Sequence, residues 1–224
     1  KTVSVSTGDN DSAGFTVSKT SVSVSETGST AIFTVALNAA PSSNVVVSVT
    51  SSDTGEATVA PSTLTFTPIN WNTAQTVTVT GANDAFVDGS QSSSVTLSIE
   101  DASSDDTFDP LADQTVAVTT SDDDSAGFTL SATTLTVSES GTNASFTVKL
   151  DAAPISDVII TVTGSDGGEA TASPSTLTFT SSNWNVSQSV TVTGVDDAAP
   201  DGSQVSTVDL AIDDASSDDA FDAL

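Results

Sequence analysis

The sequence lacks most of the residues on which enzyme chemistry depends. The 224-residue chain has no cysteine, histidine, tyrosine or arginine. Serine is abundant, but it has no histidine base to activate it, and transition metals lose their usual nitrogen and sulfur ligands. Paired-carboxylate chemistry, as in glycoside hydrolysis, needs a cleft lined with aromatic and polar groups, and aromatic residues make up only 5% of the chain. We therefore do not expect an enzyme.

Further absences bear on location and processing. Without cysteine there are no disulfides, which extracellular proteins often use but do not need. No apolar run approaches the ~18 residues of a membrane span, and no segment combines basic and apolar residues as a signal peptide does. Because methionine is also absent, we expect either a processed mature chain or a fragment of a longer protein.

Positive charge is nearly absent too. Thirty acidic residues stand against three lysines, for a formal net charge of -27. Such a chain repels nucleic-acid phosphates and anionic membrane surfaces, so we expect no nucleic-acid partner and no membrane insertion. The charge favours bound cations and a strongly hydrated surface. Valine, isoleucine, leucine and phenylalanine recur in short regular runs, which distinguishes the chain from an acidic disordered one.

The chain repeats itself at a fixed offset of 113 residues without any insertion. Each repeat is long enough to bury its own core, so we expect an array of domains rather than a solenoid. The expected domains are residues 12–124 and 125–224, with residues 1–11 equivalent to the last strand of a preceding repeat. Matched pairs include Phe15 and Phe128, Glu26 and Glu139, Pro41 and Pro154, Trp71 and Trp184, and Asp84 and Asp197.

Within each repeat, apolar residues alternate with serine and threonine. This period of two, with Gly, Pro, Asn and Asp between the runs, predicts short antiparallel strands with one face in water. Seven or eight such strands in ~110 residues favour a β-sandwich of immunoglobulin-like architecture, present here as two tandem all-β domains. Examples are Phe33-Thr34-Val35-Ala36-Leu37, Val45 to Val49, Val77 and Val79, Val95 to Ile99, and Phe146, Val148 and Leu150.

The two ends of the chain are out of register with the repeat. Residues 2–8 correspond to residues 115–121, the last strand of the first repeat, whereas Leu224 corresponds to Leu111, just before that strand. Two explanations are open. The chain is cut from a longer array, or residues 1–8 complete the second domain of a neighbouring copy, because an open sandwich edge accepts an added strand.

Acidic runs stand at the start of the chain and between the repeats. Asp122, Asp123 and Asp124 are consecutive, and Asp9-Asn10-Asp11 is a near copy. Adjacent carboxylates repel unless a counter-ion is present, and a divalent cation turns that cost into a gain. Loops of an antiparallel sandwich cluster at two ends, so carboxylates from several loops can meet there. A calcium ion takes six to eight oxygen ligands of this kind.

The order and the spacing of several motifs resemble those of the Calx-beta domain, in the repetitive form that is common in large bacterial surface proteins and adhesins. The resemblance runs through both repeats and implies calcium-binding sandwiches that are extracellular or regulatory. It rests on Val24-Ser25-Glu26, Phe33 to Leu37, Pro41, Ser52-Asp53-Thr54-Gly55-Glu56, Ala60 to Phe66, Asn70-Trp71-Asn72, Gln75 to Gly81, Asn83-Asp84, Asp88-Gly89 and Asp122-Asp123-Asp124.

The same resemblance implies the calcium ligands. The acidic run that usually follows the Asp84 position is thin here, so we expect fewer or weaker calcium ions than in the richest members. If a neighbouring copy donates its N-terminus, Asp9 and Asp11 stand in for the closing aspartates of the second repeat. The implied ligands are Glu26, Asp53, Asp84, Asp88, Asp122, Asp123 and Asp124 in the first repeat, and Glu139, Asp166, Asp197 and Asp201 in the second.

The function expected from these observations is a calcium-binding spacer in an extracellular bacterial adhesin or surface fibre. Its partners would be neighbouring copies or repeats of the same protein. The alternative is a module that binds carbohydrate or a cell surface, but Trp71 and Trp184 fit strand-edge or core packing better than a carbohydrate platform. A second acidic loop, residues 100–106 and its copy 213–219, is open between a solvated loop and a weak ion site.

Overall fold

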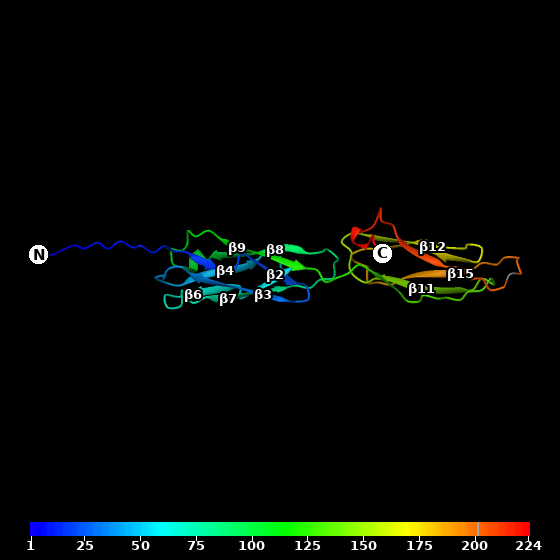
Figure 1. Cartoon of the computed structure of the whole chain (residues 1–224), viewed down its shortest axis with the longest axis horizontal. Helices are drawn as coiled ribbons and strands as arrows, with labels where there is room; N and C mark the ends of the chain where they lie inside the picture. The colour runs from blue at the N-terminus through cyan, green and yellow to red at the C-terminus, as the bar shows by residue number, and fades with distance from the viewer. Residues whose placement is uncertain (201) are drawn as a thin grey trace. The chain divides into compact units, whose positions relative to one another are not determined.

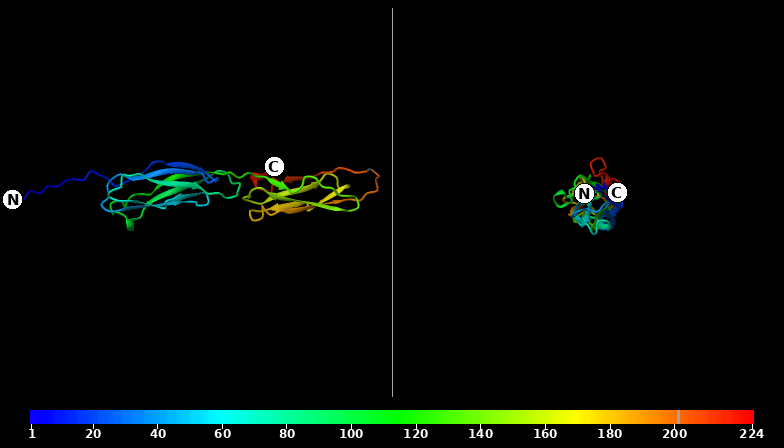
Figure 2. Two further views of the ribbon diagram at one scale, coloured as in Figure 1. Left: turned by 90° about the horizontal axis from the view of Figure 1, so that it is seen from below. Right: turned by 90° about the vertical axis from the view of Figure 1, so that its left-hand side faces the viewer.

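The computed structural model describes residues 1–200 and 202–224, and these residues form two compact units. Unit 1 comprises Lys1–Asp84 and Gly89–Asp123, and unit 2 comprises Ala85–Asp88 and Asp124–Leu224. Each unit is a β-sandwich whose strands run lengthwise in two facing layers (Figure 1, Figure 2). The prediction of two tandem all-β sandwich domains is confirmed. No helix among the described residues is both long and apolar enough to cross a membrane.

Unit 1 has two sheets. One has the strand order β1-β3-β7-β5, and the other has the order β2-β9-β8-β4-β6. A short 3-10 helix, η1 (Asp101–Ser103), follows the second sheet's strand β8. The strands are β1 (Phe15–Val17), β2 (Ser21–Ser25), β3 (Thr30–Leu37), β4 (Val45–Ser51), β5 (Ala57–Ala60), β6 (Thr63–Phe66), β7 (Gln75–Gly81), β8 (Gln91–Ile99) and β9 (Gln114–Ser121).

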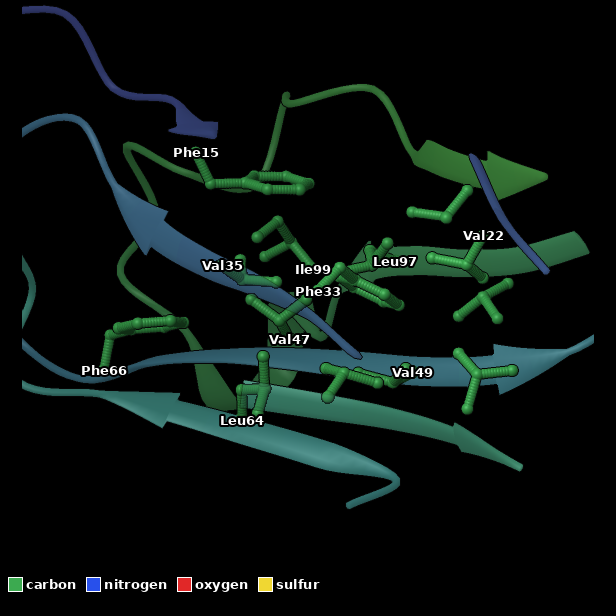
Figure 3. Close-up of a cluster of buried hydrophobic side chains, with 14 of the residues drawn as sticks. Phe15, Val22, Phe33, Val35, Val47, Val49, Leu64, Phe66, Leu97 and Ile99 are labelled. Carbon is green, nitrogen blue, oxygen red and sulfur yellow. The ribbon is translucent and has the colours of Figure 1, made fainter. Parts of the chain in front are cut away.

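The core of unit 1 follows from the alternation of its strands. Because side chains alternate between the two faces of a strand, every second residue of β3, β7, β8 and β9 enters the space between the sheets. Figure 3 shows Phe33, Leu64, Phe66 and Leu97 gathered there, all of them almost fully buried. Burying one such side chain stabilises the fold by about 1.5–3 kcal/mol.

One pairing in unit 1 differs from the antiparallel prediction. The chain changes sheets between β1 and β2, so that β2 runs parallel to β9, with Val22 opposite Val118. All other strand pairs of unit 1 are antiparallel. Alternation fixes which residues face the core but not the direction of a partner about 100 residues away, so the sequence pattern could not show this.

Unit 2 repeats most of these strands but not all of them. Its sheets have the orders β10-β11-β15-β13 and β14-β12-β16. Residues 134–138, the counterpart of β2, form no strand, and no described residues take the place of β9. In unit 1 the only sheet partner of β2 is β9, so residues 134–138 have no equivalent partner strand among the described residues. The strands are β10 (Phe128–Leu130), β11 (Asn143–Leu150), β12 (Val158–Gly164), β13 (Ala170–Ser173), β14 (Thr176–Phe179), β15 (Gln188–Gly194) and β16 (Val208–Ile212), with the 3-10 helix η2 (Asp219–Phe221).

Two segments in the first half of the chain stand apart from the sheets of unit 1. Residues 1–14 form no strand and run outside both sheets (Figure 1). Residues 85–88, between β7 and β8, belong to unit 2. There Val87 packs against the core, its N–H donates to the Ala153 carbonyl at 3.0 Å, and the Ala153 N–H donates to the Ala85 carbonyl at 2.6 Å.

Candidate metal centre

Glu26 follows directly after β2, and the local backbone fixes its position. Its N–H donates to the carbonyl of Ser121 at 3.1 Å, which ties it to the end of β9. The chain then turns at Gly28, whose φ of 81° favours glycine. Gly81 on β7 admits this turn, because a Cβ there would lie 2.1 Å from the Ser25 carbonyl oxygen. As a result the Glu26 side chain is only 1% exposed.

Asp122 and Asp124 come next to Glu26 because they continue the alternation of β9. Val116, Val118 and Thr120 face the core of unit 1. Asp122 and Asp124 are partly buried in the same phase, whereas Asp123 is exposed. The Gly89 N–H donates to Asp122 Oδ2 at 2.9 Å.

Glu26, Asp122 and Asp124 form the one candidate metal group found in the described residues. Each offers a carboxylate oxygen, and these oxygens all lie within 4.8 Å of one another. Three negative groups this close repel strongly when one of them is removed from water. A hard divalent cation suits such a donor set, since calcium prefers carboxylate oxygens and completes its six to eight ligands with carbonyls and water. The residues present therefore fit calcium.

The other ligands implied for unit 1 lie outside this group. Asp53 is exposed, and its Oδ1 accepts a hydrogen bond from the Gly55 N–H at 2.9 Å, which closes a local turn. Asp84, just before the segment 85–88, and Asp88, the last residue of that segment, are partly buried. Asp123 faces solvent. The structure thus brings together three of the seven residues that the resemblance implied for the first repeat.

The second repeat presents its implied ligands differently. Glu139 is partly exposed, unlike its buried counterpart Glu26. Asp166 Oδ1 accepts from the Gly168 N–H at 2.9 Å, and Asp197 Oδ1 accepts from the Ala199 N–H at 2.8 Å. Asp201 lies outside the described residues.

Asp9 and Asp11, the near copy of the closing aspartates, are exposed on the N-terminal segment. Asp9 Oδ1 accepts a hydrogen bond from the Asp11 N–H at 3.0 Å. Within the part of the chain that the structure describes, neither residue belongs to a group of three ligands.

The second acidic loop has a structural residue that the sequence did not reveal. Asp105 is buried and accepts hydrogen bonds from Ser42 N–H and Oγ, both at 2.6 Å, and from Ser43 N–H at 3.1 Å. Thr107 adds its N–H at 3.0 Å and its Oγ1 at 2.6 Å. These donors, the Ser42 hydroxyl first, hold the pKa of Asp105 well below its usual range. Asp105 therefore anchors the loop before β4 to the β8–β9 loop.

Unit 2 repeats this anchor with fewer donors. Asp218 accepts from the N–H groups of Ile155 at 2.7 Å, Ser156 at 2.9 Å and Ala220 at 3.0 Å. Ile155 and Ala220 stand where unit 1 has Ser42 and Thr107, so the two hydroxyl donors are absent. The only sequence signal for this role was the recurrence of an aspartate at the same place in both repeats.

A further carboxylate, just after the second acidic loop of unit 1, lies in surroundings that disfavour its charged form. Burial raises the pKa of Asp109, and the nearby charges of Asp101 and Asp106 raise it further. Its Oδ1 is buried with no hydrogen-bond partner. The pKa of Asp222 in unit 2 is raised in the same way, by burial first and then by Asp214. In each unit, therefore, burial and neighbouring carboxylates disfavour the charged form of one aspartate.

Both tryptophans fit the packing interpretation. Trp71 packs against the core of unit 1, and its carbonyl accepts the Leu37 N–H at 3.0 Å. Trp184 packs against the core of unit 2, and its carbonyl accepts the Leu150 N–H at 2.9 Å. The two tryptophans thus pack against the cores of their units at equivalent positions.

Fold and site together define a class: tandem all-β sandwich units, each with one hydrophobic core, in a chain that also holds a buried glutamate close to two aspartates. The chain belongs to the Calx-beta domain family, whose sequence model matches residues 9–124 and again residues 121–221. Calx-beta domains include calcium-binding members, among them the calcium binding domain CBD12 of CALX1.1.

Solved structures similar to this chain include two CBD12 structures. CBD12 of CALX1.1 is 17% identical, with 84% of this chain and 82% of that chain covered and a TM-score of 0.39. CBD12 from CALX1.2 is 13% identical, with 88% and 79% covered and a TM-score of 0.34. SSP-19, an MSP-domain protein like family member in Caenorhabditis elegans, is 18% identical, with 48% and 97% covered and a TM-score of 0.32. The search of curated proteins finds no match.

Proposed function

We propose that this protein is a calcium-binding structural spacer of an extracellular bacterial surface protein or fibre. The observation that carries the proposal is the group of three carboxylates, Glu26, Asp122 and Asp124, with oxygens within 4.8 Å of one another. Membership of the Calx-beta family supports calcium as the ion. The proposed role is structural rather than catalytic, since the chain has no histidine or cysteine to serve as base or nucleophile.

The three residues would hold calcium together with backbone carbonyls or water. When bound, the ion supplies positive charge to a site where carboxylates repel. Glu26 would contribute from the turn after β2, and Asp122 and Asp124 from the residues after β9. A ligand that binds only the folded protein, present at about 100 times its dissociation constant, stabilises it by about 2.7 kcal/mol.

The spacer role follows from where these ligands lie along the chain. Asp122 and Asp124 stand in the acidic run between the two repeats of the sequence. An acidic linker without a counter-ion repels itself and extends flexibly. Calcium at Asp122 and Asp124 would restrain the backbone of this linker, and copies joined end to end through residues 1–8 would extend the spacer into a fibre.

Thermal unfolding in millimolar calcium, compared with chelator and with magnesium, tests the calcium proposal. We expect calcium to raise the melting temperature of unit 1, and magnesium to do so less, because magnesium dehydrates reluctantly and demands strict octahedral geometry. Glu26→Gln should remove most of the shift while keeping the shape of the buried side chain. The matched change Glu139→Gln in unit 2 should leave the shift of unit 1 intact. An equal melting temperature of the unchanged chain in calcium and in chelator would refute the proposal.

A further inference from the structure

We propose that the peptide bond between Asp109 and Pro110 is a self-cleavage site, at which the Asp109 carboxyl group cuts its own chain. This inference goes beyond the proposed calcium-binding spacer and does not rest on the calcium site. The sequence contains no other Asp-Pro bond. Three observations support the proposal: the chemistry of this dipeptide, a buried carboxyl oxygen in a closed turn, and a matching turn in unit 2 that lacks the proline.

An aspartate that precedes a proline places an internal nucleophile beside a reactive amide. The side-chain carboxyl group of an aspartate reaches its own main-chain carbonyl carbon by closing a small ring, so no second residue has to be brought to the bond. Proline makes the amide tertiary, and a tertiary amide nitrogen takes up a proton more readily than the nitrogen of an ordinary peptide bond. Of all the bonds that follow an aspartate in this chain, the bond to Pro110 is therefore the easiest to cleave.

The proposed reaction consumes one water molecule and needs no other reactant. A carboxyl oxygen of Asp109 bonds to the main-chain carbonyl carbon, while the carboxyl proton passes to the Pro110 nitrogen. The bond between that carbon and the nitrogen breaks, and its electron pair stays on the nitrogen. Asp109 then carries a cyclic anhydride, which water opens to two carboxyl groups. Each chain reacts once, so the reaction is processing of the chain and not enzyme turnover.

Asp109 and Pro110 are the two central residues of a closed turn in the loop between β8 and β9. The Leu111 N–H donates to the Phe108 carbonyl at 3.1 Å, which closes the turn. Phe108 is buried in the core of unit 1, and Leu111 packs against the same core. The bond to be cleaved is therefore held between two residues that the core anchors.

The surroundings of the Asp109 side chain favour the protonated form that the reaction needs. Its Oδ1 is buried and has no hydrogen-bond partner among the described residues, so no donor stabilises negative charge there. Burial raises the pKa of Asp109, and nearby carboxylates raise it further. These carboxylates are Asp101 in η1 and Asp106 and Asp105 in the loop that follows, so the charges that act on Asp109 are all negative.

Water has access to the other side of the bond. Pro110 is exposed, and Asp109 is only partly buried although its Oδ1 is enclosed. The carboxyl group is thus shielded enough to retain its proton, while the anhydride formed on it would lie next to solvent. The turn therefore provides both conditions of the reaction, a neutral acid and a supply of water.

Unit 2 contains the same turn without the proline. The Leu224 N–H donates to the Phe221 carbonyl at 3.2 Å, and Phe221 is buried in the core of unit 2. Burial raises the pKa of Asp222 as well, and its Oδ1 is also buried without a hydrogen-bond partner among the described residues. Ala223 stands where unit 1 has Pro110, so the amide is an ordinary secondary one. We therefore expect cleavage in unit 1 only.

Cleavage would leave β9 on a different fragment from the other strands of its sheet. The bond lies between β8 and β9, and β9 pairs with both β8 and β2. Val116 and Val118 of β9 are buried in the core of unit 1. The two fragments should therefore stay together while unit 1 is folded and separate when it unfolds. The cleaved chain would thus keep its fold but lose its covalent continuity.

Mass spectrometry of the whole chain under denaturing conditions, after incubation between about pH 4 and about pH 7, tests the proposal. We expect two fragments that meet between Asp109 and Pro110. They should form several times faster in the folded chain than in the chain unfolded in urea, because unfolding returns the pKa of Asp109 to its ordinary value of 3.8. The bond between Asp222 and Ala223 should stay intact.

Two variants separate the reaction from general acid damage. Asp109→Asn removes the nucleophile, and Pro110→Ala restores the secondary amide that unit 2 has at the same place. Each should lose the fragments that meet at this bond, and a melting temperature close to that of the unchanged chain would show that the variant is folded. Equal rates in the folded and the unfolded chain would overturn the proposal, as would unchanged fragments in Pro110→Ala or no cleavage at this bond at any pH tested.

Discussion

The two units of this chain share a sequence pattern, loops and a buried anchor aspartate, but among the described residues only unit 1 contains a strand in the position of β9. The consequence spreads beyond the missing strand. Residues 134–138 carry the same alternation as β2, yet they form no strand. Since β2 pairs only with β9, the difference shows that this short segment depends on its partner more than on its own β-propensity.

The same difference reaches the candidate metal centre. In unit 1, the backbone bond from Glu26 N–H to the Ser121 carbonyl fixes the glutamate beside Asp122 and Asp124. In unit 2, Glu139 follows a segment without a sheet partner and stays partly exposed. The pairing of β9 with β2 thus also brings Glu26 and the aspartates together, because β9 ends at Ser121 and the aspartates follow directly.

The largest expected contrast between the units comes from equivalent leucines. Leu97→Ala in β8 removes a side chain that is fully buried in the core of unit 1, and should cost about 2–5 kcal/mol of unit 1 stability. Leu210→Ala in β16 should cost clearly less, because Leu210 already contacts water. Chemical denaturation that resolves the two units would measure both values. Equal losses of stability from Leu97→Ala and Leu210→Ala would contradict the expected difference between the two units.

A smaller effect on the stability of unit 2 should come from a substitution in the first repeat. Val87 belongs to the first repeat in sequence but packs against the core of unit 2. Val87→Ala should therefore lower the stability of unit 2 by about 1 kcal/mol, less than the full burial of a valine, and leave unit 1 unchanged. Calorimetry with two resolved transitions would show which one moves. A shift confined to unit 1 would contradict the assignment of residues 85–88.

The smallest effect concerns Asp109 and its copy Asp222, where both units should behave alike. Burial raises the pKa of each above the ordinary value of 3.8, so the folded state binds the proton more tightly than the unfolded state. Their contribution to stability therefore falls as pH rises through the folded pKa. Asp109→Asn should raise the melting temperature of unit 1 at neutral pH, and the gain should shrink in acid. Asp222→Asn is the matched change in unit 2, and a gain that grows in acid would contradict this sign.

Much of the fold could be predicted, because alternation and an exact repeat are local signals. Phe33, Val95 and Leu97 were expected to face a core, and they do. The parallel pairing of β2 with β9 could not be predicted, since it depends on the chain changing sheets after β1. The role of Asp105 was equally hidden, because its donors Ser42 and Ser43 are more than sixty residues away in sequence.

The candidate site was predictable in part. Glu26, Asp122 and Asp124 came from the resemblance and lie together, whereas Asp53 is engaged in a local turn with Gly55. The type and spacing of acidic residues indicate which loops carry carboxylates. They do not indicate which of these carboxylates accept a hydrogen bond from their own loop, as Asp53 does. The remaining ligand assignments stay predictions.

Amide hydrogen exchange of the whole chain in calcium tests most directly the claim that β9 holds β2 in its sheet, whereas residues 134–138 have no such partner strand among the described residues. Exchange reports local opening, residue by residue. We predict slow exchange along β2 and β9 and fast exchange at residues 134–138. Equal protection of β2 and residues 134–138 would contradict the account.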